Sequence, residues 1–237
     1  MSDTGDLYAV IDATWPAYRL WREGGWIFRD GRGGGKRVSA ATLIGTDATP
    51  DIGFAARTLA KVGQPPLFML RPEQAEFDAT LEAAGYRLLD PVTILIGDLD
   101  TLDSNLPTRL CVTSDDPTED MAQVWAAGGI GPARLDIMRR CPLPKTCVGL
   151  TVDGDTVSVA YAAQSGNTVM CHAVEVRASH RRQGLGRDIM RAVLGWSRDQ
   201  GAAKLAIITT DENAPALALY RGMGLQDAGR YHYRIMP

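Results

Sequence analysis

The chain has 237 residues, and its 25 lysines and arginines against 28 aspartates and glutamates give a net charge of −3. This balance argues against a nucleic-acid partner and against a polybasic membrane-surface protein. With 45% apolar and 22% charged residues, a wholly disordered chain is also excluded. No signal-peptide pattern and no uncharged run of about 20 residues occurs, so we expect a cytoplasmic protein with no membrane partner. The four cysteines match no zinc or redox spacing, so no metal is expected.

The first half of the chain alternates strand-like and helix-like segments. A helical start is followed by a hairpin around Glu23-Gly24-Gly25. The remaining patterns predict a strand at 38–44, a helix at 52–62, a strand at 67–70, a helix at 73–84 and a long strand at 86–96. Residues 99–107, where Asp and Leu alternate before a Ser-Asn-Leu-Pro sequence, are the predicted linker.

The second half has a more distinctive element order. A strand at 109–113 and helices at 117–127 and 132–140 come first. Asp-Gly and Gly-Asn turns then separate three β-rich runs, which predicts three antiparallel strands ending at residue 176. A helix at 187–200, a strand at 205–208, a helix from Asn213 to Gly224 and a closing strand complete an α/β order, β-α-α-β-β-β-α-β-α-β.

The two halves also align with each other. An offset of 139 places Gly85 on Gly224, Leu81 on Tyr220 and Phe68 on Ile207, within the same order of elements. We interpret this as a divergent internal repeat. The alternative is that both glycines are ordinary helix C-caps.

A glycine-containing loop separates the third antiparallel strand from the following helix. It reads Arg181-Arg182-Gln183-Gly184-Leu185-Gly186. Glycines at such a junction allow backbone N–H groups to converge on an anion at the positive end of the helix, and a pyrophosphate is the natural guest. The spacing differs from both the P-loop and the dinucleotide-binding pattern.

With the segment 213–225, this loop completes a pair of motifs that resembles the GNAT superfamily of acetyl-CoA-dependent N-acetyltransferases. Motif A corresponds to 174–186 and motif B to 213–225, and the resemblance covers about 109–237. It implies an α/β (α+β) GNAT fold, a mixed and mostly antiparallel sheet flanked by helices. It also implies a domain at 105–237 that binds acetyl-CoA.

The resemblance places each part of acetyl-CoA on this sequence. Pantetheine would pair with the exposed backbone of the strand that precedes the loop, and the diphosphate would lie on the loop amides. The implied contacts are Val174, Val176, Arg181, Arg182, Gln183, Gly184, Leu185, Gly186, Arg187 and Asn213. The alternatives are core packing for the two valines and a solvated basic surface for the arginines.

Tyr220 matches the tyrosine that stands beside the thioester sulfur in the family. A phenol with a pKa of about 10 can return a proton to a departing thiolate whose thiol has a pKa near 8.5. Packing of the tyrosine by its own helix is the alternative.

The attacking amine needs a base, because an alkyl ammonium with a pKa near 10.4 is almost entirely protonated at pH 7. Glu175 and His172 are the ionisable groups on the strand before the loop. Three positions apart, they would face opposite sides of a regular strand, so at most one faces the acceptor. Glu175 is the catalytic candidate, and the candidates for contact with the acceptor are Trp125, Arg134, His172 and His232. A structural role is the alternative for each.

The first half departs from the family where the cofactor would bind. Residues 43–50 offer one glycine, Asp47, which would repel phosphate, and Pro50, which lacks an N–H, and Leu81 replaces the tyrosine. We therefore expect residues 1–104 to form a degenerate GNAT-like domain without a cofactor site, in tandem with 105–237.

These observations predict an acetyltransferase that moves an acetyl group directly to a primary amine of a small molecule or peptide. It would act as a monomer or homodimer. The alternative function is a catalytically silent protein that binds or senses an acyl-CoA.

Overall fold

The computed structural model describes residues 4–46, 50–103 and 105–236. The chain divides into two compact units, neither of which is continuous in sequence. Unit 1 comprises Met1–Trp15, Ile94–Thr209 and Asn213–Ala228. Unit 2 comprises Pro16–Thr93, Thr210–Glu212 and Gly229–Pro237. Each unit has a hydrophobic core of its own.

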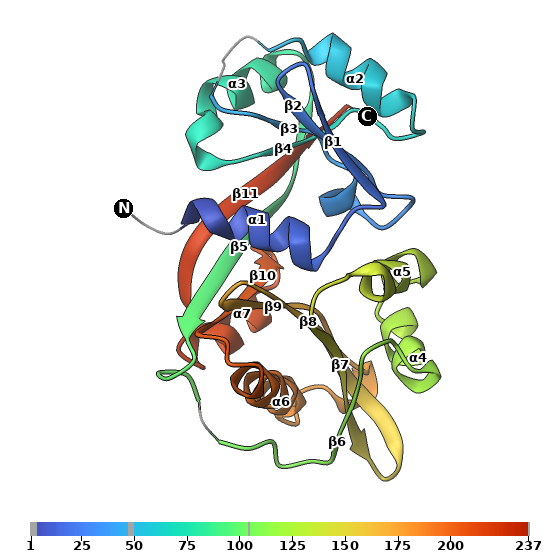
Figure 1. Ribbon diagram of the computed structural model, residues 1–237, viewed down its shortest axis with the longest axis vertical. Helices are drawn as coiled ribbons and strands as arrows, with labels where there is room; N and C mark the ends of the chain where they lie inside the picture. Colours follow the sequence, from blue (N-terminus) through green and yellow to red (C-terminus); the bar gives the residue numbers. More distant parts are fainter. Residues whose placement is uncertain (1–3, 47–49, 104, 237) are drawn as a thin grey trace. The chain divides into compact units, whose positions relative to one another are not determined.

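Unit 1 follows the element order expected from the sequence (Figure 1). Its elements are α1 (Thr4–Thr14), β6 (Cys111–Ser114), α4 (Glu119–Ala127), α5 (Pro132–Arg140), β7 (Lys145–Val152), β8 (Asp155–Ser165), β9 (Thr168–Val176), α6 (Leu185–Asp199), β10 (Lys204–Thr210) and α7 (Ala214–Arg221). Strands β6, β7, β8 and β9 pair antiparallel in that order, and β10 pairs parallel to β9. The predicted mixed, mostly antiparallel sheet is confirmed.

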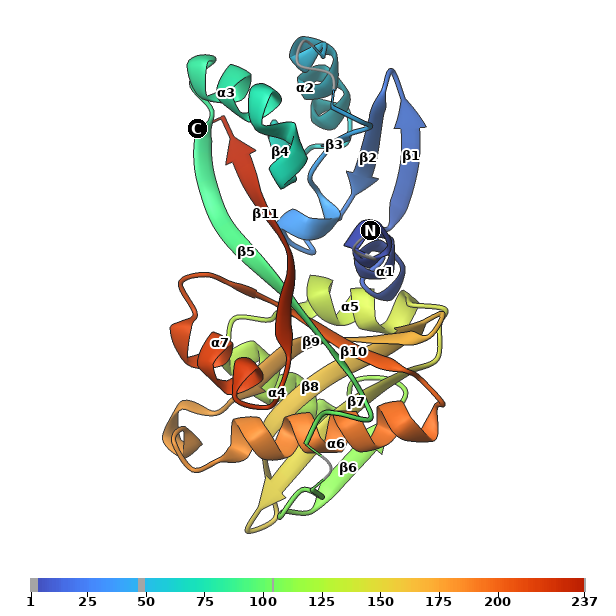
Figure 2. The same ribbon diagram turned by 90° about the vertical axis from the view of Figure 1, so that its left-hand side faces the viewer.

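Helix α6 covers one face of the unit 1 sheet, and α4 and α5 cover the other (Figures 1 and 2). Ile189, Val193 and Leu194 repeat at helical spacing on α6, and all three are fully buried in the unit 1 core. Thr118 caps α4 by accepting a hydrogen bond from the Met121 amide. A capping side chain therefore fixes where α4 begins, and burial of one apolar face stabilises α6 against the sheet.

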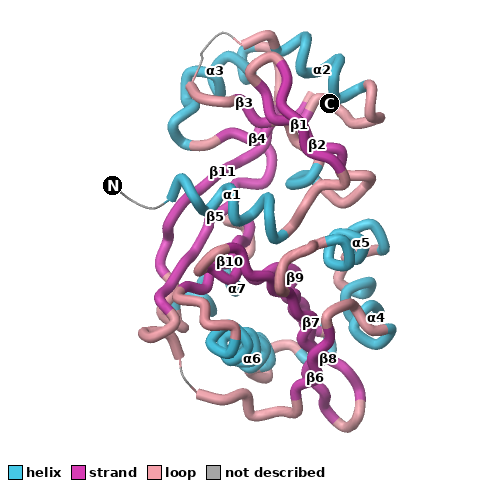
Figure 3. Tube along the Cα trace, in the orientation of Figure 1, coloured by secondary structure: helices cyan, strands magenta, loops and turns pink. Residues whose placement is uncertain are grey.

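Unit 2 is built around aromatic side chains. Its elements are β1 (Arg19–Glu23), β2 (Trp26–Asp30), β3 (Thr42–Leu43), α2 (Ile52–Ala60), β4 (Leu67–Leu70) and α3 (Ala75–Ala83), and they are coloured by type in Figure 3. Trp26 and Phe28 from β2 share one core with Phe68 from β4 and Phe77 from α3. Both helices contribute to this core, so both pack against the strands.

The strand expected at 38–44 is mostly absent. Lys36–Val38 forms a 3₁₀ turn, and regular pairing is limited to Thr42–Leu43. Ala41 makes an isolated parallel bridge with Phe68 through backbone hydrogen bonds to Leu67 and Met69. The apolar pattern of this segment reflects burial against β4 and not an extended strand.

The internal repeat is visible in the structure. The offset of 139 maps β4 into β10 and α3 onto α7. Gly85 and Gly224 follow these helices with φ of 88° and 100°, a left-handed conformation that favours glycine. The tandem arrangement of two similar element orders is confirmed.

The last strand of each half is built into the unit of the other half. The end of β5 (Arg87–Asp98) belongs to unit 1, where the strand order is β5-β10-β9-β8-β7-β6. The end of β11 (Gln226–Ile235) belongs to unit 2, where His232–Ile235 pair antiparallel with β4. The compact units are consequently not the two contiguous halves of the sequence.

The segment predicted as a linker is packed structure over much of its length. Leu99 and Leu102 are buried in the unit 1 core, and Arg198 of α6 donates hydrogen bonds to both of their carbonyl oxygens. The linker prediction was wrong for these residues. The alternation of Asp and Leu that indicated a loop instead turns both leucines inward, while Asp100 is exposed and Asp103 forms an ion pair with Arg191 of α6.

Residues 105–237 expressed alone are expected to be poorly soluble. This fragment lacks α1 and the buried leucines Leu95, Leu99 and Leu102 of the unit 1 core. Each buried leucine contributes about 2–5 kcal/mol, against a total stability of about 5–15 kcal/mol for a domain. Soluble yield and cooperative thermal unfolding, compared with the full chain, are the measurements. Co-expression with residues 1–104 is the control and should restore solubility, whereas a soluble, cooperatively unfolding 105–237 fragment would contradict the expectation.

Candidate active site

A β-bulge interrupts β9 just before the predicted site. In the ladder with β8, His172 pairs with Tyr161 and Glu175 with Val159, so three steps along β9 match two along β8. The extra residue is Ala173, which has a φ of 52°. The indole Nε1 of Trp125 donates a hydrogen bond of 2.7 Å to the Ala173 carbonyl oxygen. Helix α4 therefore holds the bulge in place.

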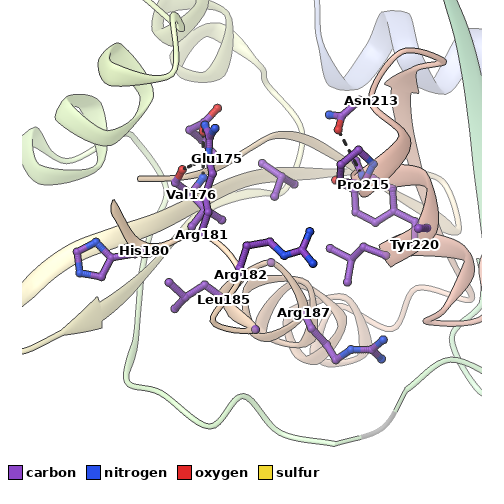
Figure 4. Close-up of a pocket in the computed structure, with 16 residues that line it drawn as sticks. Glu175, Val176, His180, Arg181, Arg182, Leu185, Arg187, Asn213, Pro215 and Tyr220 are labelled. Carbon is purple, nitrogen blue, oxygen red and sulfur yellow. Dashed lines mark hydrogen bonds and ion pairs between the residues drawn. The ribbon is translucent and has the colours of Figure 1, made fainter. Parts of the chain in front are cut away.

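The bulge ends the parallel pairing of β9 with β10. Their register runs from Lys204↔Thr168 to Ile207↔Cys171. Beyond that point lies a pocket of about 780 Å³ between the end of β9, the start of α6 and the helix α7. Every residue predicted to contact acetyl-CoA lines it except Gln183. Figure 4 shows Glu175 and Arg181 on the β9 side of this pocket and Tyr220 on the α7 side.

The glycine loop forms the floor of the pocket at the beginning of α6. Gly184 has a φ of 80°, and this left-handed residue turns the chain directly into the first helical residue, Leu185. The first amides of a helix have no carbonyl four residues before them within the helix, although here the Arg187 amide donates a hydrogen bond of 3.0 Å to the Gly184 carbonyl oxygen. The helix dipole makes this end positive. Arg182 and Arg187 add two formal positive charges to the lining. Amides, dipole and guanidiniums together fit a diphosphate.

Side chains currently cover the backbone at the end of β9. Glu175 Oε1 accepts hydrogen bonds from Arg181 Nη2 and from the Val176 amide, both at 3.1 Å. Arg181 Nε donates to the Val176 carbonyl oxygen at 3.2 Å. A ligand that pairs with Val176 must displace these two side chains.

Tyr220 closes the pocket on the α7 side. Its side chain is buried, and burial raises the pKa of the phenol well above its ordinary value, so the hydroxyl stays protonated at neutral pH. Asn213 also lines the pocket and caps α7, because its side chain accepts a hydrogen bond from the Ala216 amide. Asn213 thus caps the helix that carries Tyr220, and the phenol of Tyr220 lies across the pocket from the carboxylate of Glu175.

The part of the chain that contains this pocket matches a known protein family. Residues 120–225 match the Acetyltransferase (GNAT) family. These residues form a GNAT acetyltransferase domain. The chain is 34% identical over 87 residues to the streptothricin acetyltransferase of Streptomyces lavendulae, an alignment that covers 36% of this chain and 46% of that protein. The chain therefore spans less than half the length of this relative.

Solved structures extend the likeness in fold beyond the GNAT domain. A GCN5-related N-acetyltransferase from Kribbella flavida has a TM-score of 0.70 at 17% identity, covering 100% of this chain and 96% of that chain. A tandem GNAT protein from the clavulanic acid biosynthesis pathway has a TM-score of 0.60 at 17% identity, covering 83% and 74%. Both likenesses support the GNAT fold, and the second supports the tandem arrangement.

The bulge corrects one argument about the GNAT domain's candidate base. A regular strand would place His172 and Glu175 on opposite faces, but the extra residue Ala173 returns them to the same face. His172 is buried beside Trp15 and Tyr161, with its Nε2 2.9 Å from Thr14 Oγ1. Glu175 alone of the pair lines the pocket.

The residues predicted to contact the acceptor do not gather at the pocket. Trp125 is fully buried and bonded to the bulge, and Arg134 is a half-buried residue of α5. His232 belongs to unit 2, where it lies 2.8 Å from Asp78 and lines a separate pocket of about 260 Å³. Sequence reasoning missed five lining residues: His180, Pro215, Ala216, Ala218 and Leu219. Ala216 and Leu219 lie on the same face of α7 as Tyr220, so helical spacing from Tyr220 could have indicated these two lining residues.

Gly128→Ala is expected to lower turnover by about 10²-fold and to change the affinity for the acyl donor by much less. A Cβ at this position would lie 2.4 Å from both Cδ and Oε2 of Glu175, so the carboxylate must move, and such displacements cost about this much. Steady-state kinetics and calorimetry measure the two quantities. Gly131→Ala, in the same α4–α5 joint, is the control because its Cβ would meet nothing within 4 Å. Equal kcat values for the two variants would contradict the placement of Glu175.

Clusters of metal ligands and membrane-spanning helices are both absent from the part of the chain that the structure describes. Within it, no three His, Cys, Asp or Glu side chains come together as metal ligands would. None of its helices combines the length and the apolar character needed to cross a membrane.

Proposed function

We propose that the protein is an acetyl-CoA-dependent N-acetyltransferase that transfers the acetyl group directly to a primary amine. The observation that carries this proposal is that the glycine loop, Tyr220 and the end of β9 beyond its pairing with β10 meet in one pocket. Acetyl-CoA supplies an acyl group activated as a thioester. The loop amides from Gln183 to Arg187 would hold its diphosphate, Arg181, Arg182 and Arg187 would add charge, and Val174 and Val176 would pair with pantetheine.

In this proposal Glu175 takes the proton from the acceptor ammonium, directly or through water. Its carboxylate is available in the pocket once Arg181 turns to the diphosphate. Tyr220 donates its proton to the departing sulfur on the other side. The raised pKa of Tyr220 keeps this proton in place until the thiolate, a strong acceptor, develops beside it.

We further propose that only the second half binds acetyl-CoA, with 1–104 as a degenerate domain and 105–237 as the GNAT domain. At the equivalent helix start in unit 2, Asp51 Oδ1 accepts a hydrogen bond of 2.7 Å from the Phe54 amide. A carboxylate therefore occupies the helix N-terminus where a phosphate would bind. Leu81, at the position equivalent to Tyr220, is fully buried and has no proton to donate. Asp47, also expected to repel phosphate, lies outside the described residues.

Calorimetry with acetyl-CoA and a thiol-release assay with a panel of amines test the function. We expect one acetyl-CoA per chain, and CoA release that depends on a small-molecule amine or a peptide amine. Two bound molecules per chain would contradict the degenerate first half. Tight binding without thiol release from any amine would favour the alternative, a silent acyl-CoA-binding or sensor protein. Light scattering distinguishes monomer from homodimer.

A further inference from the structure

Arg109 makes two contacts that converge behind the glycine loop. It lies just before β6, and its Nη1 forms an ion pair with Asp188 Oδ2 of α6. Its Nη2 donates a hydrogen bond of 3.0 Å to the carbonyl oxygen of Gln183. One guanidinium thus connects the first turn of α6 to the loop that precedes it, across more than 70 residues of sequence.

The ion pair between Arg109 and Asp188 balances a negative charge close to the glycine loop. Asp188 is a buried carboxylate in the first turn of α6, the same helix end that we propose for the donor diphosphate. Burial raises its pKa, but hydrogen bonds from Thr108 and Arg109 outweigh burial, and the net pKa is lowered. The group is therefore negative at neutral pH. Two guanidiniums flank this carboxylate, Arg109 at Oδ2 and Arg191, whose Nη1 lies 3.4 Å from Oδ1. Loss of the nearer partner, Arg109, would strengthen the repulsion between this charge and a second anion.

The second contact orients a donor. In a trans peptide the carbonyl and the following N–H point in opposite directions. The carbonyl of Gln183 is held by Arg109, so the N–H of the same peptide, that of Gly184, is directed away from Arg109. Gly184 lines the pocket, and its left-handed conformation depends on the orientation of this peptide.

We propose that Arg109 is a positioning residue for the diphosphate of the acyl donor. It neutralises Asp188 and fixes the Gln183–Gly184 peptide, and it does not line the pocket itself. This inference rests on the proposed function, because it assumes that a diphosphate binds the loop. Arg109 matches neither motif A nor motif B, and only the fold brings it to the loop.

Arg109→Ala tests the proposal on the full-length protein, with CoA and S-acetylpantetheine as ligands. We expect its affinity for CoA to fall by about tenfold or more, because a charge-assisted hydrogen bond and an ion pair are lost. S-acetylpantetheine lacks the diphosphate, so its affinity and its kcat/KM as donor should stay within about twofold of wild type. With acetyl-CoA, KM should rise while kcat stays the same.

Two more variants separate positioning from general stability. Arg109→Lys keeps a positive charge beside Asp188 and so protects the fold, but one ammonium cannot reproduce both contacts, and we expect an intermediate loss. Arg109→Ala combined with Asp188→Asn removes the negative charge that Arg191 alone would otherwise balance, and should recover part of the affinity for CoA. Arg139→Ala, which breaks an exposed pair with Asp136, is the control and should bind CoA like wild type.

The outcomes are distinct. Wild-type affinity for CoA in both Arg109 variants overturns the inference while leaving the proposed function intact. An equal loss of CoA and S-acetylpantetheine binding shows a general structural role and overturns it as well. A wild-type protein that binds no CoA overturns the proposed function and this inference together. Selective loss of CoA binding, partly recovered in the double variant, supports it.

Discussion

Gly186→Asp is expected to abolish acetyl-CoA binding, with a loss of affinity of at least about 100-fold. Gly186 lines the pocket in the first turn of α6, and a side chain there would start 3.0 Å from Leu219 Cδ2, which also lines the pocket. A carboxylate would repel the diphosphate and accept hydrogen bonds from the same amides that we expect to bind it. Calorimetric titration with acetyl-CoA measures the effect.

The control for this variant is Gly195→Asp on the same helix. A Cβ at Gly195 meets nothing within 4 Å, so the substitution adds the same charge to the same helix away from the pocket. We expect it to bind acetyl-CoA like wild type. Gly184→Asp should also abolish binding, but it is the weaker test, because the φ of 80° at Gly184 strains any other residue. Unchanged titration of Gly186→Asp would rule out the loop as the diphosphate site.

Tyr220→Phe is expected to lower kcat by about 10²-fold and to leave the affinity for acetyl-CoA within a few-fold of wild type. Phenylalanine keeps the buried ring but removes the proton. We place the effect at the low end of the range for general acids, because burial raises the pKa of Tyr220 and makes it a weaker acid than a free phenol. Single-turnover kinetics with acetyl-CoA and a good amine acceptor give the rate of the chemical step.

A matched control is Tyr161→Phe, which removes a hydroxyl from another buried tyrosine of unit 1 that does not line the pocket. Its kcat should equal that of wild type. A donor with a more acidic leaving thiol should reduce the defect of Tyr220→Phe, because a weaker base needs less help from an acid. If Tyr220→Phe loses less than about threefold in the chemical step, the tyrosine serves only for packing.

Local patterns predicted most of the elements of the fold. Helix α5 and strands β4 and β9 begin and end where the sequence indicated, because proline at a helix start, glycine turns and apolar alternation act over a few residues. The glycine loop, together with Asn213 and Tyr220 of motif B, predicted most of the pocket lining for the same reason. The position of Gly184 before a helix is encoded in the adjacent residues.

Other features depend on contacts between distant segments, and the sequence alone did not indicate them. The predicted strand at 38–44 is mostly absent, and Ala41 instead forms an isolated bridge with Phe68. The predicted linker is packed because Leu99 and Leu102 are buried in the unit 1 core with residues of α6. The bulge at Ala173 is stabilised by Trp125, 48 residues away. A bulge adds one residue and reverses every later side chain, so the faces assigned to His172 and Glu175 could not be derived from alternation.

The sequence by itself determined the family resemblance, most of the order of elements and most of the residues that line the pocket beside the glycine loop, because these depend on short motifs and local conformational preferences. Only the tertiary structure decided to which unit the last strand of each half belongs and on which face of the sheet Glu175 lies. It also decided that Arg109 contacts the glycine loop. Pairing of β11 with β4 and the approach of Arg109 to Gln183 join residues far apart in the chain. Such contacts form because the folded chain buries apolar side chains and pairs polar and charged groups from distant segments, and no local pattern in the sequence predicts them.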